Sequence, residues 1–207
     1  MQLTKRKETN PQIGAVILAA GDSKRLGQPK QLLNFRGKTF IENVIETAIA
    51  AKLTPIIVVL GDEAEKILKI ITKFHDEIVA VMNNDWLEGQ SSSLRVAIPY
   101  LFNTSHTIFF LSDQPQISLA HIEKLKEDSL VSSNLIIATY VGERRANPVS
   151  FSRELYNELS LIQGDQGGRF LFSKYEIEKL QWSDERILID VDTLEDYEKL
   201  KGEYGEE

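Results

Sequence analysis

Residues 15–30 read AVILAAGDSKRLGQPK, and this stretch decides the fold because a buried strand runs directly into a polar loop with two glycines. The apolar run 15–18 is typical of a strand inside a parallel sheet. The loop after it supplies Gly21, Gly27, backbone amides and three cations, which is the composition of a phosphate-binding loop. A solvated glycine turn with surface cations is the competing interpretation. Neither the P-loop pattern nor G-x-G-x-x-G is present.

Outward from this stretch, short apolar runs alternate with amphipathic stretches of helical spacing. The predicted strands are 15–18, 56–60, 78–82, 107–111, 135–140, 149–151 and 187–191, and the predicted helices are 40–51, 62–74, 93–100, 119–128 and 193–201. This alternation predicts an α/β fold, a Rossmann-like three-layer sandwich with a mainly parallel sheet. The polar segment 142–148 between two strand-like runs has no room for a crossover helix, which indicates an antiparallel excursion. We expect one domain over residues 1–207, with flexible ends at 1–12 and 202–207.

The composition excludes several classes of function. Twenty-four basic and thirty-one acidic side chains give a net charge of −7, which argues against a protein that coats nucleic acid. The absence of cysteine excludes a disulfide framework, a thiolate nucleophile and a cysteine-ligated metal, and three scattered histidines do not form a metal motif. Because no apolar run has the length of a signal-peptide core or a membrane helix, we expect a cytoplasmic protein without membrane contact.

Positive charge is concentrated beside the glycine loop. Residues 22–38 hold Lys24, Arg25, Lys30, Arg36 and Lys38 against one acid, a local charge of +4. Such a cluster attracts an anionic ligand. The planar fork of Arg25 suits phosphate oxygens, and Lys30 offers a compact charge.

Two aspartates are predicted at the carboxyl edge of the sheet, where ligands of parallel sheets bind. Asp113 follows a strand and precedes Pro115, with Ser118 as a predicted helix cap; it suits a Mg²⁺ ion that bridges nucleotide phosphates, or it only stabilises its turn. Asp192 ends the predicted strand 187–191 and either binds the same ion or assists the next helix cap.

Thr193 and Asp196 have the spacing of a capping box at that helix, and Asp190 is an alternative or additional metal ligand to Asp192.

Two further loops carry convergent polar groups. Residues 83–94, NNDWLEGQSSSL, place amide and hydroxyl donors beside Trp86, which suits a nucleobase and a ribose; the alternative is a helix-capping serine with Trp86 as a buried plug. Residues 147–149 and 163–169 place Asp165 and Arg169 among glycines, which suits an anion or a pterin; the alternative is a flexible surface loop.

These motifs together resemble one family. The loop Leu-Ala-Ala-Gly-x-Ser-x-Arg-x-Gly-x-x-Lys over 18–30 resembles the signature loop of nucleotidyltransferases, particularly the molybdenum cofactor cytidylyltransferases among the MobA-like NTP transferases. Leu-x-Asp-x-Pro at 111–115, Asp-x-Asp-Thr at 190–193, Asn-x-x-Trp-x-x-Gly-x-x-x-Ser-Leu at 83–94 and Gly-Asp-x-Gly-x-Arg at 164–169 also resemble family segments. The sequence departs at Leu194, where proline is common, and at Gly168, where alanine is usual. The resemblance runs from 14 to 199.

The resemblance implies a nucleotide-diphospho-sugar transferase-like fold and transfer of CMP from CTP to the phosphate of a molybdopterin-type cofactor, with Mg²⁺ and release of pyrophosphate. It implies catalytic roles for Arg25, Lys30 and Asp113, and metal binding by Asp113 and Asp192. It implies nucleotide binding by Leu18, Ala19, Ala20, Gly21, Ser23, Arg25, Lys30, Asn83, Gly89, Ser92 and Ser93. It implies acceptor binding by Asn147, Pro148, Gly164, Asp165 and Arg169.

Several alternatives stay open. Ala20 resembles cytidylyl members, whereas guanylyl members have glycine there, so CTP is predicted over GTP. A sugar-phosphate or alcohol-phosphate nucleotidyltransferase would share the first loop and the acids. A non-enzymatic chaperone that binds a nucleotide and delivers a cofactor is a third hypothesis, and a molybdenum hydroxylase is a predicted recipient of the product.

Overall fold

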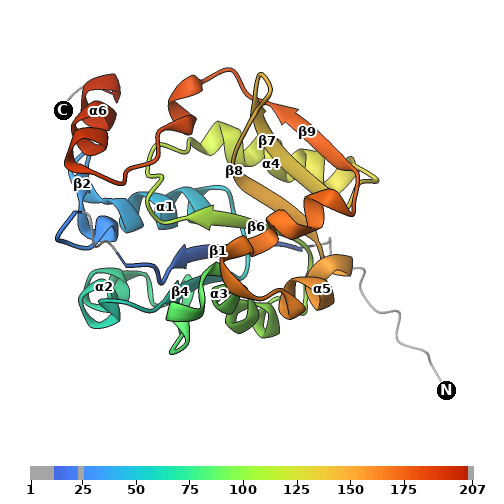
Figure 1. The fold of residues 1–207 in the computed structure, drawn as a ribbon, viewed down its shortest axis with the longest axis horizontal. Coiled ribbons are helices and arrows are strands. Elements are labelled where there is room, and N and C mark those ends of the chain that lie inside the picture. The colour runs from blue at the N-terminus through green and yellow to red at the C-terminus, as the bar shows by residue number, and fades with distance from the viewer. Residues whose placement is uncertain (1–11, 23–25, 205–207) are drawn as a thin grey trace.

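The computed structural model describes residues 12–22 and 26–204. Seven strands of this part of the chain form one twisted sheet in the order β5-β4-β1-β6-β8-β7-β9 (Figure 1). Their bounds are β1 Gln12–Ala19, β4 Ile56–Leu60, β5 Ile78–Met82, β6 Thr104–Leu111, β7 Ile136–Val141, β8 Arg144–Ser152 and β9 Ile177–Gln181. The main helices are α1 Phe40–Ala50, α2 Ala64–Ile71, α3 Gln90–Ala97, α4 Leu119–Val131, α5 Tyr156–Leu161 and α6 Leu194–Tyr204.

Short 3-10 helices complete the secondary structure: η1 Lys30–Leu32, η2 Thr72–Phe74, η3 Trp86–Glu88, η4 Ile98–Tyr100, η5 Arg153–Leu155, η6 Gly164–Ser173 and η7 Glu185–Leu188. A two-stranded hairpin, β2 Asn34–Phe35 and β3 Lys38–Thr39, precedes α1.

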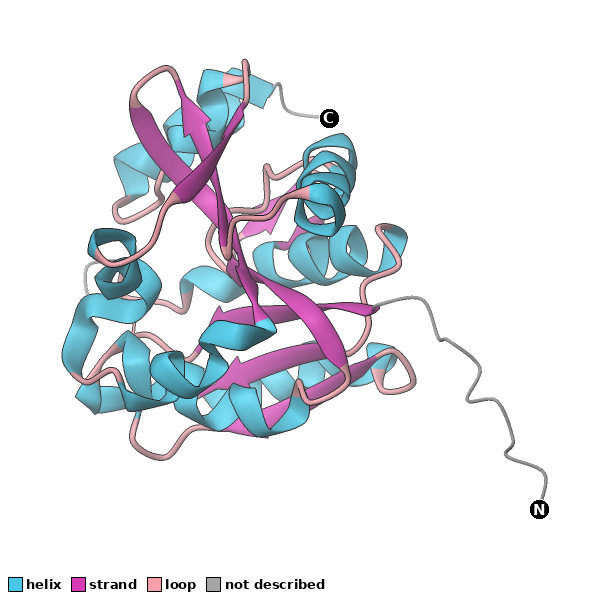
Figure 2. Ribbon diagram, turned by 90° about the vertical axis from the view of Figure 1, so that its right-hand side faces the viewer, coloured by secondary structure: helices cyan, strands magenta, loops and turns pink. Residues whose placement is uncertain are grey.

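The predicted three-layer sandwich is confirmed. Alternate residues of a strand face opposite sides of a sheet. Ile17 of β1 accordingly packs in a core cluster with α1, α2 and α4, and Val16 packs in a second cluster with α3 and α5. Helices therefore cover both faces of the sheet (Figures 1 and 2).

The sheet is mainly parallel, as predicted. Strands β5, β4, β1 and β6 run parallel, and the register pairs Ala19 with Leu60, Leu60 with Met82, and Leu18 with Leu111. The carboxyl ends of these four strands therefore lie along one edge. Strand β8 runs antiparallel to both β6 and β7, which confirms the predicted excursion. It begins at Arg144, so most of the polar segment 142–148 belongs to the strand and not to the turn.

The predicted strand 187–191 is wrong. Glu185–Leu188 is a 3-10 helix, and the residues after it pair with no strand. Its apolar pattern has another physical cause: Ile187 packs in the first core cluster, and Val191 packs with the β2-β3 hairpin and α6. The side chain of Gln116 binds the backbone carbonyl of Ile189 at 2.8 Å, in place of a neighbouring strand.

The strand next to β7 is instead β9, an edge strand that the sequence pattern missed because three of its five residues, Glu178, Lys179 and Gln181, are polar. Leu180 is its only fully buried side chain, so the segment has no apolar run. Helix α5 and the β2-β3 hairpin were also not predicted, since both are too short to show a clear period.

The predicted flexible end 202–207 is wrong as far as Tyr204, which lies in α6. The Tyr204 ring packs edge-on against Phe35, with 5.4 Å between centroids. Gln12, at the end of the other predicted flexible segment, lies in β1. None of the helices in the described ranges has the length and apolar character needed to span a bilayer.

Candidate active site

A cavity of about 730 Å³ lies at the carboxyl edge of the parallel strands. It brings together many predicted site residues from distant parts of the chain: Leu18, Ala20, Gly21, Lys30, Gly89, Ser93, Asp113, Asn147, Asp165, Arg169 and Asp192. Ala19, Asn83, Ser92, Pro148 and Gly164 do not line it. Ser23 and Arg25 lie outside the described residues.

Lys30 lies between the two predicted metal-binding acids. Its Nζ is 3.5 Å from Asp113 Oδ2 and also donates a hydrogen bond to Asp192 Oδ1. The Lys30 side chain is 15% exposed, so this ion-pair cluster is largely shielded from water. The sequence predicts separate roles for these residues but not their contact.

The segment that carries Asp192 is bound to the turn after β6 by the two glutamines that flank Pro115. Gln114 Nε2 donates to Asp190 Oδ1 at 2.7 Å, and Gln116 Nε2 donates to the carbonyl of Ile189 at 2.8 Å. The predicted capping box is confirmed: Asp196 Oδ2 accepts from the Thr193 amide at 2.9 Å, and Thr193 Oγ1 accepts from the Asp196 amide at 3.2 Å. These contacts place Asp192 beside Lys30 at the end of the first loop, although Asp192 does not follow a strand.

The carboxylate of Asp113 suits a divalent cation. Its Oδ1 atom is fully buried and accepts no hydrogen bond within the described ranges. Burial raises the pKa of Asp113, which the Lys30 ammonium opposes and Asp190 reinforces. Among the described residues no group of three or more metal-binding side chains occurs. One or two carboxylates combined with substrate phosphates are the usual ligands of Mg²⁺, so the two acids fit that ion.

The first loop is fixed by a residue that the sequence analysis missed. Gln31 is buried, and its Nε2 donates to the carbonyls of Ala19 at 3.3 Å and Gly21 at 3.2 Å. Both carbonyls lie where the chain leaves β1 and enters the first loop. The amide of a buried glutamine therefore sets the direction in which the chain leaves β1.

One wall of the cavity is a close contact between three segments. A Cβ atom on Gly61 would lie 2.7 Å from the Ala20 carbonyl oxygen and 2.8 Å from the Cβ atoms of Ala20 and Trp86. Trp86 is half-buried and lines the cavity rather than forming a buried plug. Only a glycine at 61 allows the first loop and the Trp86 turn to meet.

Hydrogen bonds of Asn83 and Ser92 fix the conformation of the loop between β5 and α3. Asn83 is buried, and its Nδ2 donates to Ser92 Oγ at 2.8 Å and to Ser93 Oγ at 3.0 Å, while its Oδ1 accepts from the Asp85 amide at 3.0 Å. These bonds fix Ser93 at the cavity wall.

The prediction that a serine caps this helix is wrong. Gly89 is the N-cap of α3, and the Gln90 amide donates instead to Asp165 Oδ1 at 3.2 Å. Gly89 has φ +97°, and a Cβ on it would lie 2.9 Å from the Asp165 backbone. The loop 83–90 and the loop 163–169 are thus in direct backbone contact, 75 residues apart in the chain.

The comparisons with known proteins agree with this geometry. The model of the family described as MobA-like NTP transferase domain matches residues 15–180. The chain belongs to the MobA-like NTP transferase family. It is therefore a nucleotidyltransferase, and the resemblance seen in the sequence is confirmed at the level of the family.

Individual relatives extend the match to nearly the whole chain. Nicotine blue oxidoreductase from Paenarthrobacter nicotinovorans is 31% identical, over 92% of this chain and 97% of its own. The crystal structure of Rv0371c from Mycobacterium tuberculosis is 29% identical, with a TM-score of 0.83 over 93% of this chain and 98% of that one. A complex of Rv0371c with manganese is 28% identical, with a TM-score of 0.77 over 91% and 97%.

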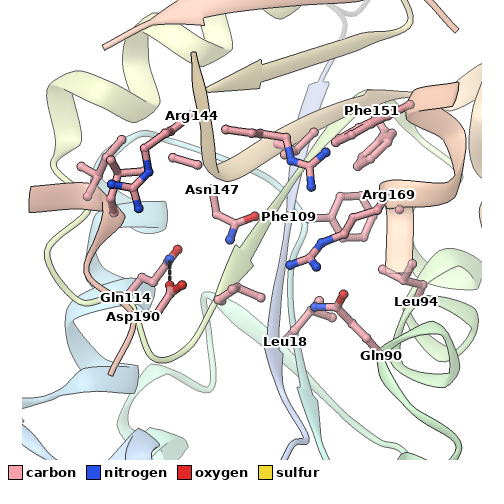
Figure 3. A pocket seen from close by; sticks show the side chains of 18 residues that line it. Leu18, Gln90, Leu94, Phe109, Gln114, Arg144, Asn147, Phe151, Arg169 and Asp190 are labelled. Atoms are coloured by element: carbon pink, nitrogen blue, oxygen red, sulfur yellow. Dashed lines mark hydrogen bonds between the residues drawn. The ribbon is translucent and has the colours of Figure 1, made fainter. Parts of the chain in front are cut away.

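A second cavity of about 170 Å³ adjoins the first in this MobA-like domain (Figure 3). The two cavities share Leu18, Gln90, Leu111, Asn147, Arg169 and Asp190. In Figure 3, the side chains of Asn147 and Arg169 point into the second cavity. Gln90 and Asp190 also line this junction; motif reasoning did not single out Gln90, because its role depends on where α3 begins.

The second cavity combines aromatic walls with cations. Phe109, Phe151 and Phe172 line it, and so do Arg144, Arg145 and Arg169. Arg145 lies over the Phe172 ring with Cζ 4.4 Å from the centroid, and none of the three arginines forms an ion pair within the described ranges. Burial, and then repulsion from Arg169, lowers the pKa of Arg145. Neither Arg144 nor Arg145 was predicted, since surface arginines on a strand carry no motif.

A buried hydrogen-bond relay supports the β8 wall from behind. His121 Nε2 is 2.9 Å from Thr139 Oγ1, which donates to the Pro148 carbonyl at 2.9 Å. Because Thr139 donates onward, His121 Nε2 carries the proton that Thr139 accepts. The His121 ring stacks on Trp182 with 4.6 Å between centroids. The Pro148 carbonyl is thus bound by Thr139, and Pro148 itself lines neither cavity.

This relay predicts a specific acid sensitivity. Burial lowers the pKa of His121 from 6.5 to about 4, against a smaller opposing effect of Asp184. Between these pH values the unfolded chain binds a proton that the folded chain does not, so the free energy of unfolding falls as the pH drops from 6.5 to 4, by up to about 3 kcal/mol. Urea unfolding at pH 7 and pH 5 should show a smaller loss in His121→Asn than in the wild type. His75→Asn, at a histidine that is 71% exposed, is the control and should keep the wild-type slope. Equal slopes in all three proteins would contradict the prediction.

Proposed function

We propose that the chain transfers the CMP group of CTP to the phosphate of a molybdopterin-type cofactor and releases pyrophosphate. The observation that carries the proposal is the pair of joined cavities. One holds the start of the glycine loop, Lys30 and two acids. The other holds aromatic walls and arginines that form no ion pair with residues in the described ranges. A nucleotide and an anionic ring compound that meet at the shared wall would fill both.

The reaction needs positioning and charge neutralisation more than covalent help. An oxygen of the acceptor phosphate attacks the α-phosphorus, and the bond to the bridging oxygen breaks with its electron pair leaving on pyrophosphate. No general base is required, since the acceptor phosphate is already ionised. Gly21 and Lys30, with Ser23 and Arg25 as predicted from the sequence, would bind the triphosphate and neutralise the charge that develops on pyrophosphate.

A divalent cation fits the two acids. Asp113 and Asp192 would hold it, and magnesium, the predicted ion, would supply Lewis-acid polarisation of the α-phosphate. The manganese complex of Rv0371c supports a divalent cation in general, not magnesium in particular.

The acceptor side would use Arg169 and Asn147 at the junction and Arg144 and Arg145 beyond it. Arginine guanidinium groups bind phosphate with paired hydrogen bonds, and flat rings pack on aromatic side chains. Asp165 and Gly164 would contribute by holding this loop against α3. Pro148 would contribute through the position of Asn147.

Ala20 is the residue that we expect to favour CTP. Its Cβ is part of the close contact with Gly61 and Trp86, so it narrows the cavity where a base would lie. Replacing Ala20 by glycine should relax the preference for CTP over GTP, since it removes one methyl group. The measurement is the ratio of kcat/KM for the two nucleotides in wild type and variant. A wild-type enzyme that favours GTP would contradict the assignment and support guanylyl transfer instead.

The decisive test of function is pyrophosphate release with each nucleoside triphosphate, with and without molybdopterin-type cofactor. We expect release with CTP only when the cofactor is present. Release with a sugar phosphate or an alcohol phosphate instead would support that alternative acceptor. Nucleotide binding without any release would support a cofactor-delivery chaperone. A molybdenum hydroxylase as recipient can be tested by its activation with the purified product.

One observation favours a second candidate function. The relative that is 31% identical is named an oxidoreductase. The chain has no G-x-G-x-x-G motif, and a hydride transfer would leave the contacts of Lys30 with two acids without a role. Consumption of a reduced nicotinamide cofactor in the presence of a dye acceptor, without any pyrophosphate release, would favour this candidate.

A further inference from the structure

The contact between Lys30 and the two acids carries an inference that rests on the proposed function and extends it. Lys30 Nζ is 3.5 Å from Asp113 Oδ2 and donates to Asp192 Oδ1, so an ammonium group lies where both predicted metal ligands converge. The Lys30 side chain is less exposed than either carboxylate, at 15% against 25% and 39%. The Lys30 side chain is thus the least exposed of the three.

An ammonium and a divalent cation repel each other strongly at this range. The repulsion between two like charges about 4 Å apart is strong at the effective dielectric constant near a protein surface, and it is larger when one ion is doubly charged. The same two carboxylates therefore cannot bind both cations well at once.

A nucleotide triphosphate changes this balance because it offers Lys30 new anionic partners. Lys30 begins η1, directly after the loop that starts with Ala20 and Gly21 at the cavity wall. A small rotation of a long, flexible side chain would take its ammonium from the carboxylates to a phosphate in the same cavity. The freed carboxylates would then accept the divalent ion.

We infer that Lys30 holds the place of the divalent cation between Asp113 and Asp192 until a nucleotide binds, so that metal and nucleotide enter the site together. In this arrangement one side chain has two successive partners. Lys30 balances the negative charge of Asp113 and Asp192 in the free protein, and it neutralises phosphate charge in the nucleotide complex.

The test is Mn²⁺ binding to the full chain, measured from the electron paramagnetic resonance signal of free Mn²⁺. The variants Lys30→Met and Lys30→Gln should bind Mn²⁺ at least about ten-fold more tightly than the wild type when no nucleotide is present. With saturating α,β-methylene-CTP, which cannot be turned over, the order should reverse. The variants should then bind Mn²⁺ less tightly than the wild type, because the phosphates have lost a cation.

The reversal distinguishes this role from a structural ion pair, which would not respond to the nucleotide. Lys124→Met is the matched control, since it removes an exposed ammonium that is paired with Asp128 on α4. It should leave Mn²⁺ binding within about two-fold of the wild type. Thermal unfolding of both Lys30 variants checks that they are folded, and Mn²⁺ alone should raise their melting temperature more than that of the wild type.

Two failures are distinguishable. If Asp113→Asn abolishes Mn²⁺ binding but the Lys30 variants bind Mn²⁺ no more tightly than the wild type without nucleotide, the place-holding role is wrong and the metal site stands. If Asp113→Asn and Asp192→Asn leave Mn²⁺ binding unchanged in every protein, the metal site of the proposed function is wrong, and the role of Lys30 is wrong with it.

Discussion

Replacing Asp113 by asparagine is expected to reduce turnover by about a hundred-fold or more while the chain stays folded. The two side chains have nearly the same shape, but asparagine lacks the negative charge that would bind a cation against the α-phosphate. Burial already disfavours the charged form of Asp113 and raises its pKa, so loss of the charge should not lower the free energy of unfolding. The measurement is pyrophosphate release at saturating CTP and acceptor.

Two control variants separate this effect from a general loss of charge. Asp128→Asn, at a half-buried residue of α4 that lines neither cavity, should keep full turnover. Asp190→Asn tests the alternative metal ligand, since Asp190 already accepts a hydrogen bond from Gln114. Near-normal turnover in Asp113→Asn, or a larger loss in Asp190→Asn, would show that the metal site is assigned to the wrong acid.

Replacing Gly89 by alanine is expected to destabilise the protein and to reduce turnover on the order of a hundred-fold. The backbone at Gly89 has φ +97° and ψ −177°, a region that is essentially restricted to glycine. The new Cβ would also lie 2.9 Å from backbone atoms of Gly164 and Asp165, which cannot rotate away. The loop that carries Arg169 would have to move off α3, and the two cavities would separate. We expect the free energy of unfolding to fall by about 3 kcal/mol or more.

Gly142→Ala is the matched control for backbone strain. Gly142 also has a positive φ, +59°, but a Cβ there would meet nothing within 4 Å. Its cost should be about 1 kcal/mol, with turnover unchanged. Chemical denaturation and pyrophosphate release should be measured for both variants. Equal losses in the two would show that strain alone, and not the contact between the loops, explains the effect at Gly89.

The sequence by itself determined the sheet interior and the chemistry of the first loop. The strands β1, β4, β6 and β7 were predictable because strands in the interior of a sheet need continuous apolar runs. The edge strand β5 was predictable because its residues are all apolar, although only Val81 is buried. The capping box at Thr193 and the cap at Ser118 were predictable because a helix start uses side chains only three residues away. Features that depend only on residues close together in the sequence can be predicted from the sequence alone.

Only the tertiary structure decided how the site is joined. The sequence could not show that Lys30 contacts Asp113 and Asp192, that Gln31 fixes the first loop, or that Asp165 binds the Gln90 amide, because each pair is separated by between 10 and 162 residues. Segment 187–192 was misread as a strand for the same reason: its apolar residues pack into two clusters formed by distant elements. A residue pattern records that a side chain is buried, whereas the partner that buries it is set by the packing of the whole chain.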